Sequence, residues 1–160
     1  MTGDSTMRMK RVVSVAVATA GLVGMTLATA PVASAAPISY DPPVCDIGFA
    51  CLYYHSSSYA LAHKIDVNGS WRLDFGAKFE TAANISDFAG WIFSASLYGS
   101  EGAGQSVKNN AAYVSNFSDT QTYRVYYNSG YNCSVACQDF FGVGDLNSQM
   151  INNNASGKFL

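Results

Sequence analysis

The sequence predicts an all-β protein built from a β unit that is used twice. Two segments carry the repeat: LYYHS at residues 52–56 returns as VYYNS at 125–129, and VKNNAA at 107–112 returns as INNNAS at 151–156. In each copy the aromatic segment precedes the Asn-rich one. Similarity in this order indicates one supersecondary unit whose apolar face is covered by its copy.

Short strand-like segments recur along the chain, and no segment shows a helical pattern of three turns. The segments are rich in β-branched and aromatic residues, and turn sequences such as Asn68-Gly69 separate them. The predicted strands cover residues 50–55, 61–67, 91–98, 111–117, 120–127 and 140–143.

The alternation of apolar and polar residues refines some of these strand assignments. Tyr123, Val125 and Tyr127 fall on one face of the strand predicted at 120–127, so this face is expected in the core. Residues 85–95 are denser in apolar side chains and fit either a buried strand or a short helix-like connection. The first copy of the repeat is longer than the second, which predicts an insertion between residues 68 and 91.

The N-terminal 35 residues have the pattern of a secretory signal peptide. Arg8, Lys10 and Arg11 precede the uncharged stretch 12–30, and small residues at 33–35 form a cleavage site. A membrane anchor is the competing interpretation, because about 20 apolar residues can span a bilayer. We expect cleavage after Ala35, a secreted extracellular protein and a single domain at residues 36–160.

The composition of residues 36–160 limits the classes of partner that we expect. This part of the chain has six basic and ten acidic residues, a formal charge of −4. It offers no basic stripe for nucleic acid. We therefore expect neither a nucleic-acid partner nor, after signal cleavage, a membrane partner, and we expect a monomer.

All four cysteines lie in the predicted secreted part. An even number in an oxidising compartment implies two disulfides, for which three pairings are possible. We favour Cys45 with Cys51 and Cys133 with Cys137, because each pair brackets a short, turn-prone segment. Such short loops contribute only about 2 kcal/mol each in the chain-entropy model, so these bonds would mainly stiffen loops. The ring from Cys133 to Cys137 is then either a fixed binding loop or a simple hairpin tether.

Catalytic and metal-binding patterns are weak. The two histidines, His55 and His63, lack metal-ligand spacing, and no nucleophile with a positioned base is visible. The Asn-rich segments lack the carboxylates that give most calcium affinity, which favours asparagines that satisfy turn backbone groups, although Ser156 leaves weak calcium binding open. We expect no cofactor, no metal site and no enzymatic activity.

Several short motifs together resemble the Streptomyces-type metalloproteinase inhibitor family. They are the Cys45 to Cys51 segment with its following aromatic strand, the run 104–112, the strand 124–129 and the closing run 151–156. This resemblance implies two Greek-key motifs packed as a βγ-crystallin-like sandwich. It also implies inhibition of secreted thermolysin-like metalloproteases by a disulfide-bridged, substrate-like loop.

The matching loop here is formed by Cys133, Ser134, Val135, Ala136 and Cys137. Carried over from the family, Cys133 and Ser134 would flank the bond presented to the protease, with Val135 next. This loop is one residue shorter than the family type, and Ser134 replaces a bulky apolar residue. If Val135 enters the protease pocket instead, the register shifts by one residue.

An inhibitor is therefore the function that we expect. Two alternatives come from other classes of protein: a crystallin-like structural or weak calcium-binding module, and a secreted surface-binding or toxin-like protein. The many tyrosines would serve the latter as rigid stacking area.

Overall fold

The structure is a computed structural model that describes residues 45–67 and 69–160. The predicted signal peptide at 1–35 and the first residues of the predicted domain, 36–44, lie outside the described residues. In the described part the protein is all-β, as the sequence predicted. Residues 45–67 and 69–160 form nine short strands and a single helix of six residues.

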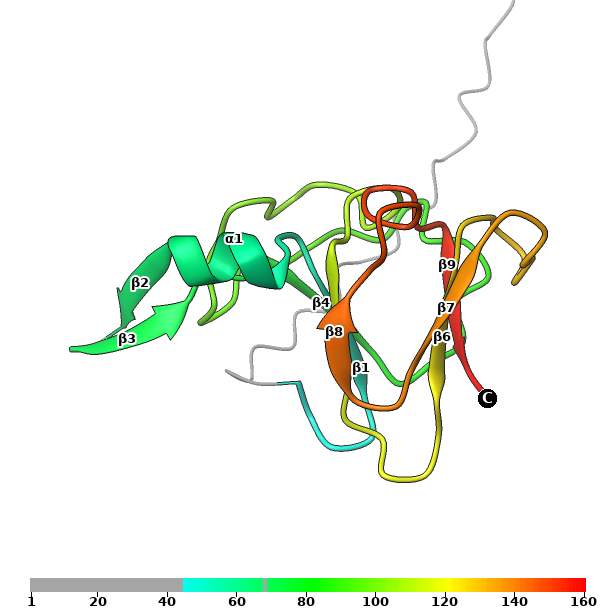
Figure 1. The fold of residues 1–160 in the computed structure, drawn as a ribbon, viewed down its shortest axis with the longest axis horizontal. Coiled ribbons are helices and arrows are strands. Elements are labelled where there is room, and N and C mark those ends of the chain that lie inside the picture. The colour runs from blue at the N-terminus through cyan, green and yellow to red at the C-terminus, as the bar shows by residue number, and fades with distance from the viewer. Residues whose placement is uncertain (1–44, 68) are drawn as a thin grey trace, which may run out of the picture. The chain divides into compact units, whose positions relative to one another are not determined.

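Antiparallel pairing organises the strands into two larger sheets and one hairpin (Figure 1). The four-stranded sheet has the order β4 (Lys78–Thr81), β1 (Ala50–Tyr53), β5 (Tyr113–Asn116), β8 (Val143–Asp145). The three-stranded sheet has the order β7 (Cys137–Phe140), β6 (Tyr123–Tyr126), β9 (Ser156–Phe159). The hairpin consists of β2 (Lys64–Val67) and β3 (Ser70–Leu73), and it follows helix α1 (Ser57–Ala62).

The main core lies between the two larger sheets. Leu52 of β1 and Val114 of β5 belong to the same buried cluster as Tyr123 and Val125 of β6. The predicted core face of the strand at 120–127 is therefore confirmed for Tyr123 and Val125, both fully buried. Tyr126 points to the other face but is also buried, where its ring lies 5.8 Å from that of Tyr131.

The two halves of the chain form matching and interlocked units. β1, β4 and β5 of the first half pair in the same order as β6, β7 and β9 of the second. β8, from the second half, extends the first sheet, and Ile85, from the first half, bridges to Gly157 of β9 in the second sheet. Each half thus contributes its third extended segment to the sheet of the other.

The structure shifts part of the repeat by one residue. The aromatic strands align as predicted, because Tyr53 and Tyr126 occupy equivalent positions opposite Tyr113 and Ser156. In the Asn-rich turns, however, Asn109 corresponds to Asn152, with φ angles of 62° and 56°. Asparagine tolerates this left-handed conformation. The two turns therefore align at the first Asn of each run, one residue away from the alignment that sequence similarity suggested.

The insertion in the first half is divided between two places. One part, α1 with β2 and β3, lies between β1 and β4, and the other is the long connection from Ile85 to β5. The strand predicted at 91–98 is wrong, because this segment makes only isolated bridges from Ile92, Ser94 and Ser96. Its apolar density reflects burial of Phe93 in the core.

The strand predicted at 140–143 is also wrong. β7 ends at Phe140 and β8 begins at Val143, so Phe141 and Gly142 form the turn between them. Sequence composition missed β3, β4, β7, β8 and β9 as separate strands. In β4 this happened because Lys78 and Glu80 are charged, although both are buried.

Candidate functional site

The loop predicted to be inhibitory lies in the connection between β6 and β7. Its disulfide joins Cys133 to Cys137, which is the first residue of β7, with the two Cα atoms 5.2 Å apart. Cys133, Ser134 and Val135 are exposed, and Val135 exposes 51% of its surface. Ala136 is half-buried and packs against the core. The ring is thus held at its β7 end and open to solvent at Val135.

Hydrogen bonds fix the backbone of this loop. The Tyr127 amide donates to the Ala136 carbonyl at 3.0 Å, which closes the base of the connection. The Ser134 amide donates to Asn132 Oδ1 at 2.8 Å, and Asn128 Nδ2 donates to Ser134 Oγ at 3.2 Å. Ser134 is therefore hydrogen-bonded to the segment that precedes the ring.

Ser156 of β9 holds the connection between β6 and β7 in place through its hydroxyl group. Its fully buried hydroxyl donates to the Asn128 carbonyl at 2.7 Å and accepts the Tyr131 amide at 3.2 Å. Tyr131 has a φ angle of 59°, and the Lys158 ammonium lies 5.6 Å from its ring centroid. Sequence analysis considered Ser156 only as a calcium ligand. In the structure it supports the loop, in the position that Tyr113 occupies in the first half.

Charged groups stabilise the surroundings of the loop. Lys108 Nζ lies 3.0 Å from Asp87 and donates to Ser129 Oγ at 3.1 Å, just before the ring. The pKa of Asp87 is lowered first by the Ala89 amide that it accepts and then by Lys108. Across β6 and β7, Arg124 pairs with Asp139 through Nη2 and Oδ2 at 2.7 Å and lowers the pKa of that carboxyl.

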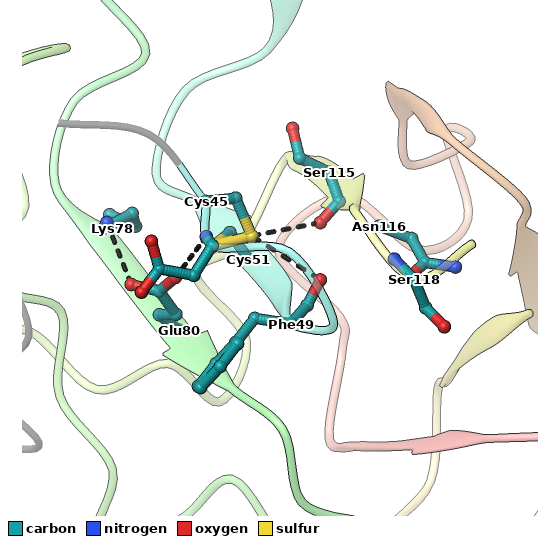
Figure 2. The surroundings of a disulfide bond; sticks show 9 residues. Cys45, Phe49, Cys51, Lys78, Glu80, Ser115, Asn116 and Ser118 are labelled. Carbon is teal, nitrogen blue, oxygen red and sulfur yellow. Dashed lines mark hydrogen bonds and ion pairs between the residues drawn. A yellow bond between two sulfur atoms is a disulfide. The ribbon is translucent and has the colours of Figure 1, made fainter. Parts of the chain in front are cut away.

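The other disulfide has different surroundings (Figure 2). Cys45 and Cys51 are buried, and Glu80 lies beside them, accepting the Asp46 amide at 2.7 Å. Lys78 Nζ lies 3.0 Å from the Glu80 carboxylate, and both side chains are only 3% exposed. The two disulfides of the structure are the two that the sequence favoured among the three possible pairings.

The side chains of the Asn-rich turns bond backbone groups, either in their own turn or in the turn of the other half. The buried Asn154 side chain accepts the Ala111 amide at 3.0 Å and donates to the Val107 carbonyl at 2.9 Å. Asn110 and Asn153 donate to carbonyls of their own turns. These contacts favour the interpretation that the asparagines satisfy backbone groups of the turns rather than hold an ion.

Metal-ligand geometry occurs in the described residues at Cys45, Cys51 and Glu80. Both sulfur atoms are bonded to each other, so they are not available as thiolate ligands. Residues 45–67 and 69–160 contain no helix that is long and apolar enough to cross a membrane.

A second group of side chains was missed by sequence reasoning. The rings of His55 and His63 stack on that of Tyr59, with centroids 3.6 and 4.0 Å away. Glu101 accepts from the Tyr59 hydroxyl at 2.8 Å and lies 3.2 Å from His55 Nε2. Only Tyr59 lies in α1, because His55 precedes the N-cap residue Ser56 and His63 is the C-cap residue. The spacing of four residues was therefore only a partial signal for these contacts.

Comparison with known proteins found no matching family model, no matching curated protein and no matching solved structure. The resemblance to metalloproteinase inhibitors therefore rests on the sequence motifs.

Proposed function

We propose that this protein is a secreted inhibitor of thermolysin-like metalloproteases that presents the loop from Cys133 to Cys137 as a substrate-like segment. The observation that carries the proposal is a loop that is exposed at Val135 yet fixed by a disulfide and by hydrogen bonds at its base. Ordering a flexible peptide costs about 0.5 to 1.5 kcal/mol per immobilised side chain, and a fixed loop avoids part of this cost. Two disulfides agree with an oxidising, extracellular compartment.

The strand order supports the finer fold that the family resemblance implies. In a Greek key, the fourth strand lies beside the first, which also pairs with the second. β5, β1 and β4 follow this order, as do β9, β6 and β7, and the third segment of each half joins the opposite sheet. We therefore infer two Greek keys packed as a βγ-crystallin-like sandwich.

Within the loop, we assign Val135 to the apolar pocket of the protease. Ser134 is bonded to Asn128 and Asn132, and Ala136 packs against the core. Val135 is the apolar side chain that the ring leaves open to solvent. This assignment shifts the register by one residue from the family pattern, in which Cys133 and Ser134 flank the presented bond.

Titration of a thermolysin-like protease with the oxidised protein tests the function. We expect residual activity to fall linearly to zero near one equivalent and the inhibition to be lost when Cys133 and Cys137 are both replaced by Ala. Absence of inhibition by a micromolar excess of folded protein would reject this class of target.

A matched pair of variants tests the assignment of Val135. Val135→Ala should weaken inhibition roughly tenfold to a hundredfold, because the protease pocket loses apolar contact. Val143→Ala is the control, since Val143 is 59% exposed but lies on β8 of the other sheet. Equal inhibition constants for the two variants would contradict the assignment of Val135. The inhibitor function itself is tested separately by the protease titration.

A further inference from the structure

The outer face of the four-stranded sheet carries a pocket walled by aromatic side chains. Its volume is about 110 Å³. Tyr53 of β1 and Tyr113 of β5 line it, and the connections between strands supply further rings. The lining residues are Cys45, Tyr53, Phe75, Tyr98, Tyr113, Ser115 and Phe117.

Most of the ring pairs in this pocket meet at steep angles rather than as a parallel stack. The Tyr53 centroid lies 5.6 Å from Phe75, 6.1 Å from Tyr98 and 6.0 Å from Tyr113, with interplanar angles of 54°, 83° and 66°. Phe75 and Tyr98 also meet edge to face at 6.2 Å, whereas Phe75 and Tyr113 lie closer to parallel, 4.6 Å apart with an interplanar angle of 38°. The negative π face of an aromatic ring attracts an organic cation that lies within about 6 Å of the ring centroid, so a pocket lined by several rings is suited to such a ligand.

The charge around the pocket favours the same ligand. Its lining contains no Lys, Arg or His. Asp145 lies directly opposite Tyr113 in the β5 and β8 ladder. Burial raises the pKa of Tyr113, and the Asp145 carboxylate raises it further; burial likewise raises the pKa of Tyr53, with added contributions from Tyr98 and Glu80. The tyrosines thus stay neutral at pH 7. Lys78, opposite Tyr53, pairs with Glu80, so the charges of these two groups offset each other, and the Asp145 carboxylate leaves a negative charge beside the pocket.

The size of the pocket limits what can enter. An apolar cavity of about 150 Å³ accommodates a benzene molecule, whereas sites for drug-sized ligands start at about 300 Å³. A volume of about 110 Å³ therefore takes one compact group and leaves the remainder of the ligand outside. We propose that this pocket binds the trimethylammonium group of a small soluble organic cation. The proposal is independent of the inhibitory loop, which belongs to the other sheet.

Calorimetric titration with choline and with its uncharged isostere 3,3-dimethylbutan-1-ol tests the proposal. We expect saturable choline binding with a roughly millimolar Kd, as one headgroup can provide, and binding of the isostere at least about tenfold weaker. Equal affinity for the two compounds would overturn the proposal, because the pocket would then be a simple apolar site. No saturation at about 50 mM choline would also overturn it.

Two substitutions at one position locate the binding. Tyr113→Phe keeps the ring and should change choline affinity by less than about threefold, whereas Tyr113→Leu should weaken it at least about tenfold. Trp71→Leu is the control outside the pocket, at a β3 residue that is 73% exposed. If Tyr113→Leu does not fold, the pair Tyr98→Phe and Tyr98→Leu replaces it. Equal choline affinity of the Phe and Leu variants would overturn the proposal.

The same headgroup also occurs on lipid surfaces, so a vesicle experiment separates the sources. We expect choline to bind and the protein to stay in the supernatant with phosphatidylcholine vesicles. Sedimentation with these vesicles without binding of free choline would overturn the assignment to a small solute.

Discussion

The two disulfides close rings of similar size but lie in opposite surroundings. Cys45 and Cys51 are 4% and 0% exposed and pack beside the Lys78 and Glu80 pair, whereas Cys133 lies at the surface next to the open side of its loop. In the chain-entropy model their similar sequence separations give similar contributions to stability. The difference between them therefore lies in the environment: the first bond is part of a packed layer, and the second shapes a surface.

The same contrast appears in the acidic residues of the two halves. Glu80 lies opposite Cys51 on β1, and Asp139 lies at the equivalent position opposite Arg124 on β6. Glu80 is buried with Lys78, while the side chains of Asp139 and Arg124 are 47% and 32% exposed. The two equivalent acidic residues thus belong to ion pairs of very different exposure.

Removal of a cation should show the largest difference between the halves. Lys78→Met leaves the buried Glu80 carboxylate without this partner, and we expect the free energy of unfolding to fall by about 3 to 5 kcal/mol. Arg124→Met removes an exposed partner and should cost no more than about 1 kcal/mol. Urea denaturation at pH 7 measures both. Equal losses would contradict the assignment of different weights to the two pairs.

Removal of each disulfide should show the next largest effect. Replacing Cys45 and Cys51 by Ala should lower the free energy of unfolding by about 2 to 4 kcal/mol, because the loop constraint is lost within a buried layer. Replacing Cys133 and Cys137 should cost about 2 kcal/mol or less and act mainly on inhibition. Denaturation curves and protease titration of the same two variants separate the effects. A greater loss of stability from the second replacement would reverse our interpretation.

Two strand glycines provide a steric comparison. A Cβ on Gly157 would clash with the Tyr123 hydroxyl, and Phe88 lies 3.0 Å away, whereas a Cβ on Gly144 would meet only Phe140 at 3.7 Å. Gly157→Ala should therefore destabilise the protein by about 1 to 3 kcal/mol, while Gly144→Ala should change stability by less than about 0.5 kcal/mol. Thermal unfolding of the two variants checks this difference. Equal melting temperatures would show that the core adjusts around Tyr123.

The smallest expected effect concerns pH. Arg124 holds the pKa of Asp139 below its ordinary value of 3.8. A lowered folded-state pKa contributes stability above the ordinary value, and this contribution disappears as the pH falls through the folded-state pKa. Asp139→Asn should cost less than about 1 kcal/mol at pH 7, and the difference from the unmodified protein should shrink below the ordinary pKa and vanish below the lowered folded-state pKa.

Asp119→Asn is the matched control, because it removes one charge from an exposed position between β5 and β6. A pH-independent difference between the unmodified protein and Asp139→Asn would argue against the ion pair as its source.

Sequence patterns were most reliable where local chemistry and tertiary packing agree. The all-β class, the buried face with Tyr123 and Val125, and the equivalence of the aromatic strands β1 and β6 all follow from alternation and self-similarity. Sequence patterns failed where tertiary packing overrides the local propensity for a strand. β4 holds the buried charges Lys78 and Glu80, and β9 contains a glycine opposite Ile85. Phe93 lies in a buried segment that is only bridged.

For the candidate site, the sequence located the ring and its cysteines but not its support. The contact of Ser156 with the Asn128 carbonyl joins residues 28 positions apart, and no local pattern specifies it. The aromatic pocket likewise gathers Tyr53, Phe75, Tyr98 and Tyr113 from separate parts of the chain.

By itself, the sequence determined the all-β class, the duplicated unit and the short rings that its cysteines could close. These properties follow from local periodicity and spacing, which are written in consecutive residues. Only the tertiary structure decided which disulfide is buried, which acidic residue is exposed and which tyrosines share a pocket. Burial depends on long-range strand pairing, and here that pairing exchanges β8 and Ile85 between the two sheets.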